Sequence, residues 1–408
     1  MRLLFIAVIV GLVSNGLSIE IGGFPVTIER AIGLTLIALM SISIASDHSK
    51  YAGKDLILLL LAWNAILFVS AVLTASPGAH MAALAISLVP TAAFWLIVRY
   101  QLPHATIARV VQNVLWFSGI AGLIGLIVGR VAGYEISLWY DDMGRMRLFI
   151  SEPNLLGSAM GFLILVSMAR AKFTLSWIIP IALSVFVLLA ANSRVPVLAF
   201  GICAVLFSIL RSIATRRGVN QSLLLPLWAG VALLTVILVF STQVQDFYDT
   251  SLRREDTYSV RAFLIDVALE RFREKPVLGA GPGDFGLQNF NIMKQFGATD
   301  RNTLWVPNMF ISVLHDSGIA GIIVYTVFLV ALTVTGLRRI FRGSVAHCAY
   351  VSAFLFIVIC SQATTVHLSI IFGVAAGLVG LRFEPQRRLI DARPRADAST
   401  RSVPRPVA

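Results

Sequence analysis

Residues 56–74 read LILLLLAWNAILFVSAVLT, a run of nineteen positions without one charged side chain. A helix needs roughly 20 consecutive, mostly apolar residues to cross the hydrocarbon core of a bilayer. The run is also too long and too uniformly apolar for the buried core of a water-soluble domain. We therefore expect residues 56–74 to form a transmembrane helix.

The whole chain has the same character. Of its 408 residues, 57% are apolar and only 13% are charged, and the mean hydropathy is +0.84. This composition predicts an all-α integral membrane protein with about twelve transmembrane helices. A window of about 19 residues gives these expected spans: 3–19, 26–45, 56–74, 81–98, 108–129, 155–170, 174–191, 195–212, 222–241, 309–336, 348–364 and 368–382.

Basic residues indicate the orientation. If the N-terminus is cytoplasmic, most Lys and Arg residues fall in the inner loops and the C-terminal tail, as the positive-inside rule requires. The net charge of +12 is then explained by topology and lipid contact, and it gives no reason to expect nucleic acid as a partner. We expect a multi-pass protein of the bacterial inner membrane with both termini in the cytoplasm.

The spans divide the chain into four parts. The only sizeable soluble segment falls on the periplasmic side, and the C-terminal stretch is rich in Pro and Arg without apolar periodicity, which indicates a disordered tail. The expected parts are a bundle of spans 1 to 9 at 1–241, a large periplasmic loop at 242–308, spans 10 to 12 at 309–382 and a basic cytoplasmic tail at 383–408.

The periplasmic loop contains PVLGAGPGDFG at residues 276–286. Its glycines do not match a dinucleotide-binding fingerprint, because Asp284 occupies the place of the third glycine. Nucleotides are also cytoplasmic ligands, so we interpret the glycines as a turn that packs closely after a helix. The preceding residues 258–275 have the apolar stripe of an amphipathic helix, with Arg261 in its first turn. An arginine at a helix N-terminus suits an anion, although Arg261 could equally be a solvated helix residue.

Two shorter motifs fall at the outer ends of expected spans. In ANSRVPVL, residues 191–198, Arg194 either extends to a lipid phosphate or binds a substrate pyrophosphate through its guanidinium group. In LFISEPNLLGSAMGF, residues 148–162, Glu152 and Asn154 flank a proline, which is ordinary chemistry for the start of a helix. Contact with Arg194 in the folded protein would give the second motif a functional meaning.

Together, the motifs resemble the O-antigen ligase and polymerase superfamily of bacterial envelope glycosyltransferases. The resemblance covers roughly residues 140–325 and rests on the order and the common outer-side placement of four segments. They are SEPNLLGSAMGF, ANSRVPVLAFG, RAFLIDVALERFREKPVLGAGPGDFG and WVPNMFISVLHDSGIAGII. It implies an undecaprenyl-diphosphate-linked glycan as donor, a glycan or lipid as acceptor and no nucleotide sugar. The six histidines are scattered along the chain, so we also expect no metal and no other cofactor.

The resemblance also implies roles for individual residues. Arg194 and Arg261 match the arginines expected to hold the diphosphate and to stabilise it as the leaving group. Ligases of the superfamily typically carry a His-Asn pair before the tenth span, whereas this chain has Pro307 and Asn308. This departure favours polymerisation of repeat units over ligation. The residues expected to support the site are Asn154, Ser193, Asn308, Gly281 and Asp284.

An acceptor hydroxyl needs a base to take its proton. His315 and Asp316 would lie about 10 Å into a continuous tenth span, at 1.5 Å per residue, where ionisable groups are costly. We expect the catalytic base to be His315, then Asp316, then Glu152, with Asp284 as a further carboxylate. The alternative is that His315 and Asp316 are a packing pair between helices.

Two other classes of protein remain open. A flippase or transporter would also have about twelve spans, but we find neither internal repeats nor a pattern of ionisable residues near the midplane. A structural assembly partner would not need two arginines at an outer cavity. Chain-length regulators or flippases are possible protein partners of the enzyme.

Overall fold

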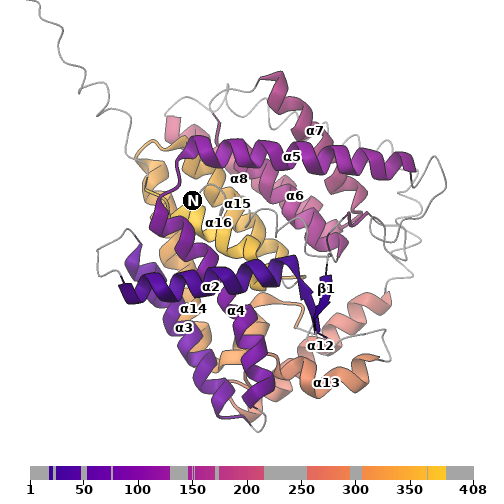
Figure 1. The fold of residues 1–408 in the computed structure, drawn as a ribbon, viewed down its shortest axis with the longest axis vertical. Helices are drawn as coiled ribbons and strands as arrows, with labels where there is room; N and C mark the ends of the chain where they lie inside the picture. Colours follow the sequence, from indigo (N-terminus) through magenta and orange to yellow (C-terminus); the bar gives the residue numbers. More distant parts are fainter. Residues whose placement is uncertain are drawn as a thin grey trace, which may run out of the picture.

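The computed structural model describes residues 18–21, 24–46, 53–74, 77–128, 146–148, 150, 152–170, 174–215, 255–294, 306–364 and 366–382. These residues form a helical bundle with one small hairpin (Figure 1). The elements are β1 Ser18–Ile21, β2 Phe24–Thr27, α2 Ile28–Ser46, α3 Lys54–Val72, α4 Pro77–Tyr100, α5 His104–Leu126, α6 Pro153–Ser167, α7 Leu175–Ala190, α8 Arg194–Thr215, α12 Glu255–Glu274, α13 Asp284–Lys294, α14 Met309–Phe341, α15 Val345–Cys360, η3 Val366–Leu368 and α16 Ile370–Gly380.

The hairpin corrects the all-α prediction at one place. Strands β1 and β2 pair antiparallel, with Ser18 opposite Thr27 and Ile21 opposite Phe24. The sequence between them is Gly22–Gly23, a pair favoured in two-residue hairpins. Residues 18 and 19, the last two of the expected span at 3–19, belong to β1.

Among the described residues, five helices are long and apolar enough to cross a membrane, by length and composition alone: α3, residues 83–100 of α4, α5, α8 and α14. Five shorter apolar helices are found at Arg30–Ile42, α6, α7, α15 and α16. The expected spans at 3–17 and 222–241 lie outside the described residues, as does the tail at 383–408. A membrane α-helical protein is therefore supported, whereas the count of twelve spans stays a prediction.

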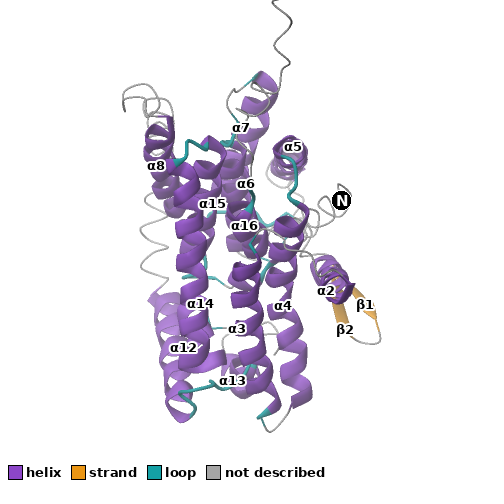
Figure 2. Ribbon diagram, turned by 90° about the vertical axis from the view of Figure 1, so that its left-hand side faces the viewer, coloured by secondary structure: helices purple, strands orange, loops and turns teal. Residues whose placement is uncertain are grey.

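The helices are not all parallel. Helices α2 and α5 run from side to side in Figure 1 and are seen nearly end-on in Figure 2, where α3, α4 and α14 run vertically. Helix α16 packs closely on α4 at Gly373, where an added Cβ would stand 2.1 Å from the carbonyl oxygen of Pro90. The glycine thus lets the two backbones touch, as small residues do between membrane helices.

Helices α12 and α13 come from the expected periplasmic loop, and both lie at the lower end of the bundle in the two views (Figures 1 and 2). The amphipathic helix predicted at 258–275 matches α12. Its apolar face buries Leu264 and Ala268 in a small cluster with Phe285 of α13 and Val306 before α14. This packing attaches the loop to the beginning of α14.

Helix α14 is broken, which corrects the expectation of a continuous tenth span. Gly318 has φ 65° and ψ −164°, a conformation outside the helical region. The hydroxyl of Tyr325 donates to Sδ of Met309 at 3.6 Å, although sixteen residues of straight helix would separate their backbones by about 24 Å. The short segment of α14 before Gly318 therefore folds back along the longer segment after it, and His315 and Asp316 lie beside the bend.

Candidate functional site

The glycine-rich segment 276–283 lies against the break in α14. A broken helix leaves carbonyl groups unpaired before the break and N–H groups unpaired after it, and buried groups of this kind need partners. The segment supplies partners to both sides. The four hydrogen bonds run from Ala280 N to His315 O at 2.7 Å, from Gly281 N to Asp316 O at 3.2 Å, from Ile319 N to Pro276 O at 2.9 Å and from Ala320 N to Val277 O at 3.2 Å.

Glycine is required where the two segments meet. A Cβ on Gly279 would stand 2.5 Å from the carbonyl oxygen of His315, and a Cβ on Gly318 would stand 2.3 Å from that of Val277. Both glycines have positive φ, 73° and 65°. The interpretation of the glycines in residues 276–286 as a close-packed turn after a helix is confirmed at Gly279. The turn completes the backbone of a broken helix.

His315 and Asp316 form a buried pair at this break. Nδ1 of His315 lies 2.7 Å from Oδ1 of Asp316. A carboxylate oxygen accepts, so Nδ1–H donates, and in the neutral imidazole Nε2 keeps its lone pair. Nε2 has no hydrogen-bond partner among the described residues, and its nearest charged group is Oδ2 of Asp284 at 3.9 Å. This is the arrangement of a base held in one tautomer by a carboxylate.

The pair is covered in this conformation. The His315 side chain is fully buried, and the ring of Phe285 stands over it edge-on with centroids 5.8 Å apart. Asp284 and Phe285 are the first two residues of α13. Nε2 is therefore closed to a substrate hydroxyl in this conformation, and the start of α13 is one of the segments that cover it.

The second group of expected site residues lies where α6 and α8 begin. Oγ of Ser193 donates to Oδ1 of Asn154 at 2.5 Å, which joins the two helix starts. Arg194 is the first residue of α8 and is half-buried, while Glu152 is exposed at the N-terminal end of α6. The two motifs predicted separately from the sequence therefore meet, through Asn154 and the neighbour of Arg194.

Arg261 of α12 belongs to the same group. Partial burial lowers the pKa of its guanidinium group, and the nearby carboxylate of Glu152 opposes that shift. Glu152 therefore lies within electrostatic range of Arg261. It also precedes α6, whose Asn154 bonds Ser193, the residue before Arg194. Arg194 itself begins α8. Because α12 begins at Glu255, Arg261 lies in its second turn and not, as expected, in the first.

Asn308 has a structural role in the described chain. Its side-chain oxygen accepts the backbone N–H groups of Phe310 and Ile311, at 3.0 and 3.1 Å, which makes it the N-cap of α14. Asn308 therefore fixes where the segment of α14 before Gly318 begins, about two turns before His315 in sequence.

His80 of α4 joins the His315 group, and sequence reasoning did not include it in the site. It is buried, and its Nδ1 lies 2.9 Å from the carbonyl oxygen of Pro282. Residue 80 is separated from the glycine-rich segment by some two hundred positions, so no local pattern could have signalled the contact.

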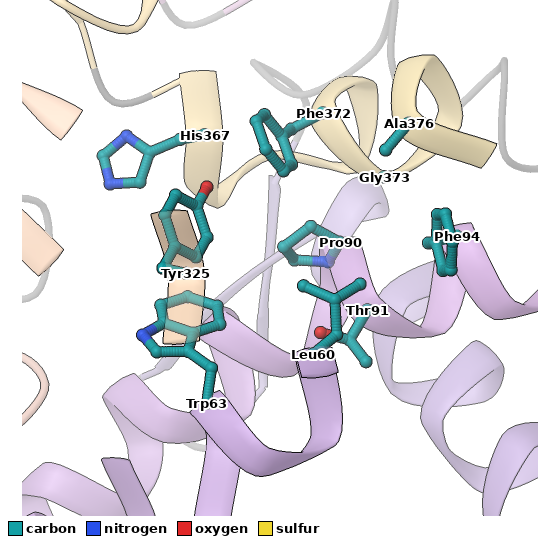
Figure 3. A pocket seen from close by; sticks show the side chains of 10 residues that line it. All are labelled: Leu60, Trp63, Pro90, Thr91, Phe94, Tyr325, His367, Phe372, Gly373 and Ala376. Atoms are coloured by element: carbon teal, nitrogen blue, oxygen red, sulfur yellow. The ribbon is translucent and has the colours of Figure 1, made fainter. Parts of the chain in front are cut away.

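A third polar feature lies inside the bundle, away from both groups. His367 of η3 stands beside Tyr325, with Trp63 and Phe372 around them (Figure 3). Neither ring nitrogen of His367 has a hydrogen-bond partner among the described residues. The gap is too narrow for an ordered water molecule, so water cannot supply the missing hydrogen bonds.

In the described parts of the chain, no three His, Cys, Asp or Glu side chains gather as a set of metal ligands. Independence from metals stays a prediction of the sequence.

Comparison with known proteins gives one finding. A family model described as O-Antigen ligase matches residues 179–326, a range that contains Arg194, Arg261, Asp284 and His315. A search of the curated proteins finds no match. The family match supports an envelope-glycan function of ligase or polymerase type, with a lipid-linked glycan substrate and an acceptor in the membrane, and together with the apolar helices it suggests an inner-membrane protein. The match over residues 179–326 bears out the resemblance and supports the assignment to the O-antigen ligase and polymerase superfamily.

Proposed function

We propose that the protein is a glycosyltransferase that polymerises glycan repeat units at the periplasmic face of the bacterial inner membrane. Its donor is a glycan linked to undecaprenyl diphosphate, and it needs no metal. The observation that carries the proposal is that Glu152 and Arg194 lie at the starts of α6 and α8, while Arg261 of α12 is within electrostatic range of Glu152. Both α8 and α12 begin inside the matched range.

Arg194 and Arg261 bind the diphosphate of the donor. Guanidinium groups match phosphate oxygens in a bidentate fashion and stay charged at every physiological pH. In the reaction, the acceptor oxygen bonds to the anomeric carbon, and the bond from that carbon to the diphosphate oxygen breaks. The two arginines then stabilise the negative charge that develops on the departing lipid diphosphate.

His315 takes the proton of the acceptor hydroxyl. Its Nδ1–H donates to Asp316, which leaves Nε2 as the proton acceptor. Because Nε2 is buried under the start of α13, this role requires that α13 opens when the substrates bind. Glu152 is the second candidate for the base, and its exposure and its closeness to Arg261 favour it.

Polymerisation is preferred to ligation because Pro307 stands where ligases of the superfamily carry histidine. The main alternative is transfer of a finished glycan to a lipid or protein acceptor with His315 or Glu152 as the base. A polysaccharide flippase is the third possibility. It forms no glycosidic bond, so it would not need arginines that stabilise a diphosphate leaving group.

The arginines decide between an enzyme and a transporter. Arg194→Ala and Arg261→Ala are introduced separately into a strain that lacks the chromosomal copy, and the glycan product is measured beside the protein level. Arg271→Ala is the matched control, since Arg271 lies on the same helix as Arg261, is partly exposed and pairs with Glu274 at 2.9 Å. Loss of product in the two site variants at normal protein level supports the enzyme. Unchanged product in both contradicts it.

A second series identifies the base. His315→Asn, Asp316→Asn and Glu152→Gln remove one candidate each without a large change of volume. Loss of a general base lowers the rate by about 100-fold or more. Full chain elongation in all three variants would remove every base that we propose.

A further inference from the structure

His80 stands out among the buried ionisable groups because it bonds a backbone carbonyl at the edge of the proposed site. It is 2% exposed, and its Nδ1 lies 2.9 Å from the oxygen of Pro282. A carbonyl can only accept a hydrogen bond, so the proton is on Nδ1. The contact therefore fixes both the tautomer of His80 and the position of Pro282.

Pro282 lies in the turn that leads into α13. The N–H of Asp284 donates to the carbonyl of Gly281 at 3.2 Å, which closes the turn. Gly281 and Gly283, on either side of Pro282, have φ of 102° and 78°, conformations that only glycine adopts readily. Two such residues make the turn intrinsically adaptable, so its geometry depends on external contacts.

The turn aims one carboxylate at the proposed base. Asp284 follows it directly, and its Oδ2 lies 3.9 Å from Nε2 of His315. On the other side the turn is held to α14 by the bond from Gly281 N to Asp316 O. His80 supplies the matching hold from α4, so the turn lies between two fixed partners.

We propose that His80 is a positioning residue for the glycan transfer: by holding the Pro282 carbonyl, it keeps the Asp284 carboxylate facing Nε2 of His315. When Nε2 takes the hydroxyl proton, a positive imidazolium forms between Asp316 on one side and Asp284 on the other. Asp284 stabilises that charge, and His80 acts only through it. This inference rests on the proposed function, because it assigns His315 the role of the base.

The charged neighbours of His80 agree with this role. Asp284 from α13 and His315 and Asp316 from α14 are the titratable groups around it, and both His80 and Asp284 interact electrostatically with Asp316. Thr74, just after the end of α3, approaches the same turn at Gly281, and it is neutral. His80 thus belongs to one compact group of two histidines and two aspartates.

The test compares substitutions of His80 that keep, displace or remove the hydrogen-bond donor to the Pro282 carbonyl. In His80→Asn, the amide nitrogen lies two bonds from Cβ, as Nδ1 does in histidine, so it can donate to Pro282. In His80→Gln the amide nitrogen lies one bond further, and His80→Leu has no donor. We expect elongation within about twofold of wild type for His80→Asn and about tenfold slower for the other two. Equal rates for His80→Asn and His80→Leu would overturn the proposal.

A double-mutant cycle separates positioning from simple loss of stability. If His80 acts through Asp284, then adding Asp284→Asn to His80→Leu slows the reaction no further, whereas independent roles multiply. Matched controls are His104→Asn and His104→Leu, since His104 is another partly buried histidine whose Nδ1 bonds a buried group, the Tyr350 hydroxyl at 2.7 Å. We expect both controls to elongate at the wild-type rate. Multiplying effects in the cycle would contradict the proposal.

A spectroscopic measurement keeps this inference distinct from the proposed function. In protein labelled with ¹⁵N-histidine, the signal absent from His80→Asn belongs to residue 80, and it should show a proton on Nδ1. A proton on Nε2 alone overturns the proposal even if the enzyme is confirmed. If Arg194→Ala and Arg261→Ala are fully active while the Nδ1 proton is present, the proposed function fails and the hydrogen bond stands.

Discussion

Gly318→Ala should destabilise the protein strongly, because two backbone segments meet at this residue. The new Cβ would lie 2.3 Å from the carbonyl oxygen of Val277 and 2.6 Å from the nitrogen of Gly279. Both are backbone atoms, so no flexible side chain can move aside. Alanine would also have to adopt φ 65° and ψ −164°, a region that is almost exclusive to glycine.

The size of the effect follows from these two costs. Holding a non-glycine residue in that region costs about 1–3 kcal/mol. Relieving the clash requires the glycine-rich segment to move off α14, which weakens the four hydrogen bonds that join them, at a net of about 1 kcal/mol each. If two of the four are lost, the total is about 3–5 kcal/mol, a loss found only for a few kinds of substitution.

The assay is thermal unfolding in detergent, followed by intrinsic tryptophan fluorescence. We expect the midpoint of Gly318→Ala to fall by at least about 5 °C. The matched control is Gly201→Ala on α8, where an added Cβ meets nothing within 4 Å, and helix propensity predicts no loss and up to about 1 kcal/mol of gain. Equal midpoints for Gly318→Ala and wild type would refute the broken helix as described here.

Three further substitutions test other parts of the fold by the same unfolding assay. Asn308→Ala removes the N-cap of α14 and should cost about 1 kcal/mol, whereas Asn308→Asp keeps the acceptor and should cost little. Arg339→Met removes the guanidinium that donates to the last carbonyl groups of α16 and should cost about 2–3 kcal/mol, while Arg338→Met, on the exposed face of the same turn, should cost almost nothing. His367→Leu replaces a buried ring without described partners and should leave stability unchanged or raise it by about 1 kcal/mol. A loss above about 2 kcal/mol would show that His367 has a polar partner.

The sequence was informative wherever the signal was local. The apolar runs predicted the helices well, and the amphipathic stripe predicted α12, because both signals lie within one helix. The hairpin at β1 and β2 was missed because its apolar residues continue the first expected span, and alternation over four residues is a weak pattern.

The site was predictable in its parts and not in its assembly. Arg194, Arg261 and Glu152 were recognisable from motif order, and their common neighbourhood appears only in the folded chain. The break at Gly318 was hidden, because one glycine in a long apolar run does not distinguish a tolerated helix residue from a bend. The segment that bonds the broken backbone, residues 276–281, lies some forty residues earlier in the sequence. No local pattern around Gly318 could therefore predict the bend.

The central claim is that this protein joins repeat units, and the envelope glycan profile of a deletion strain tests it most directly. The analysis resolves lipid-linked single repeats from long chains that are not attached to their final carrier. We predict that single repeats accumulate, and that the wild-type protein, but not Arg261→Ala, restores long chains. Accumulation of long unattached chains would identify a ligase instead, and a profile identical to that of the parent strain would contradict the account.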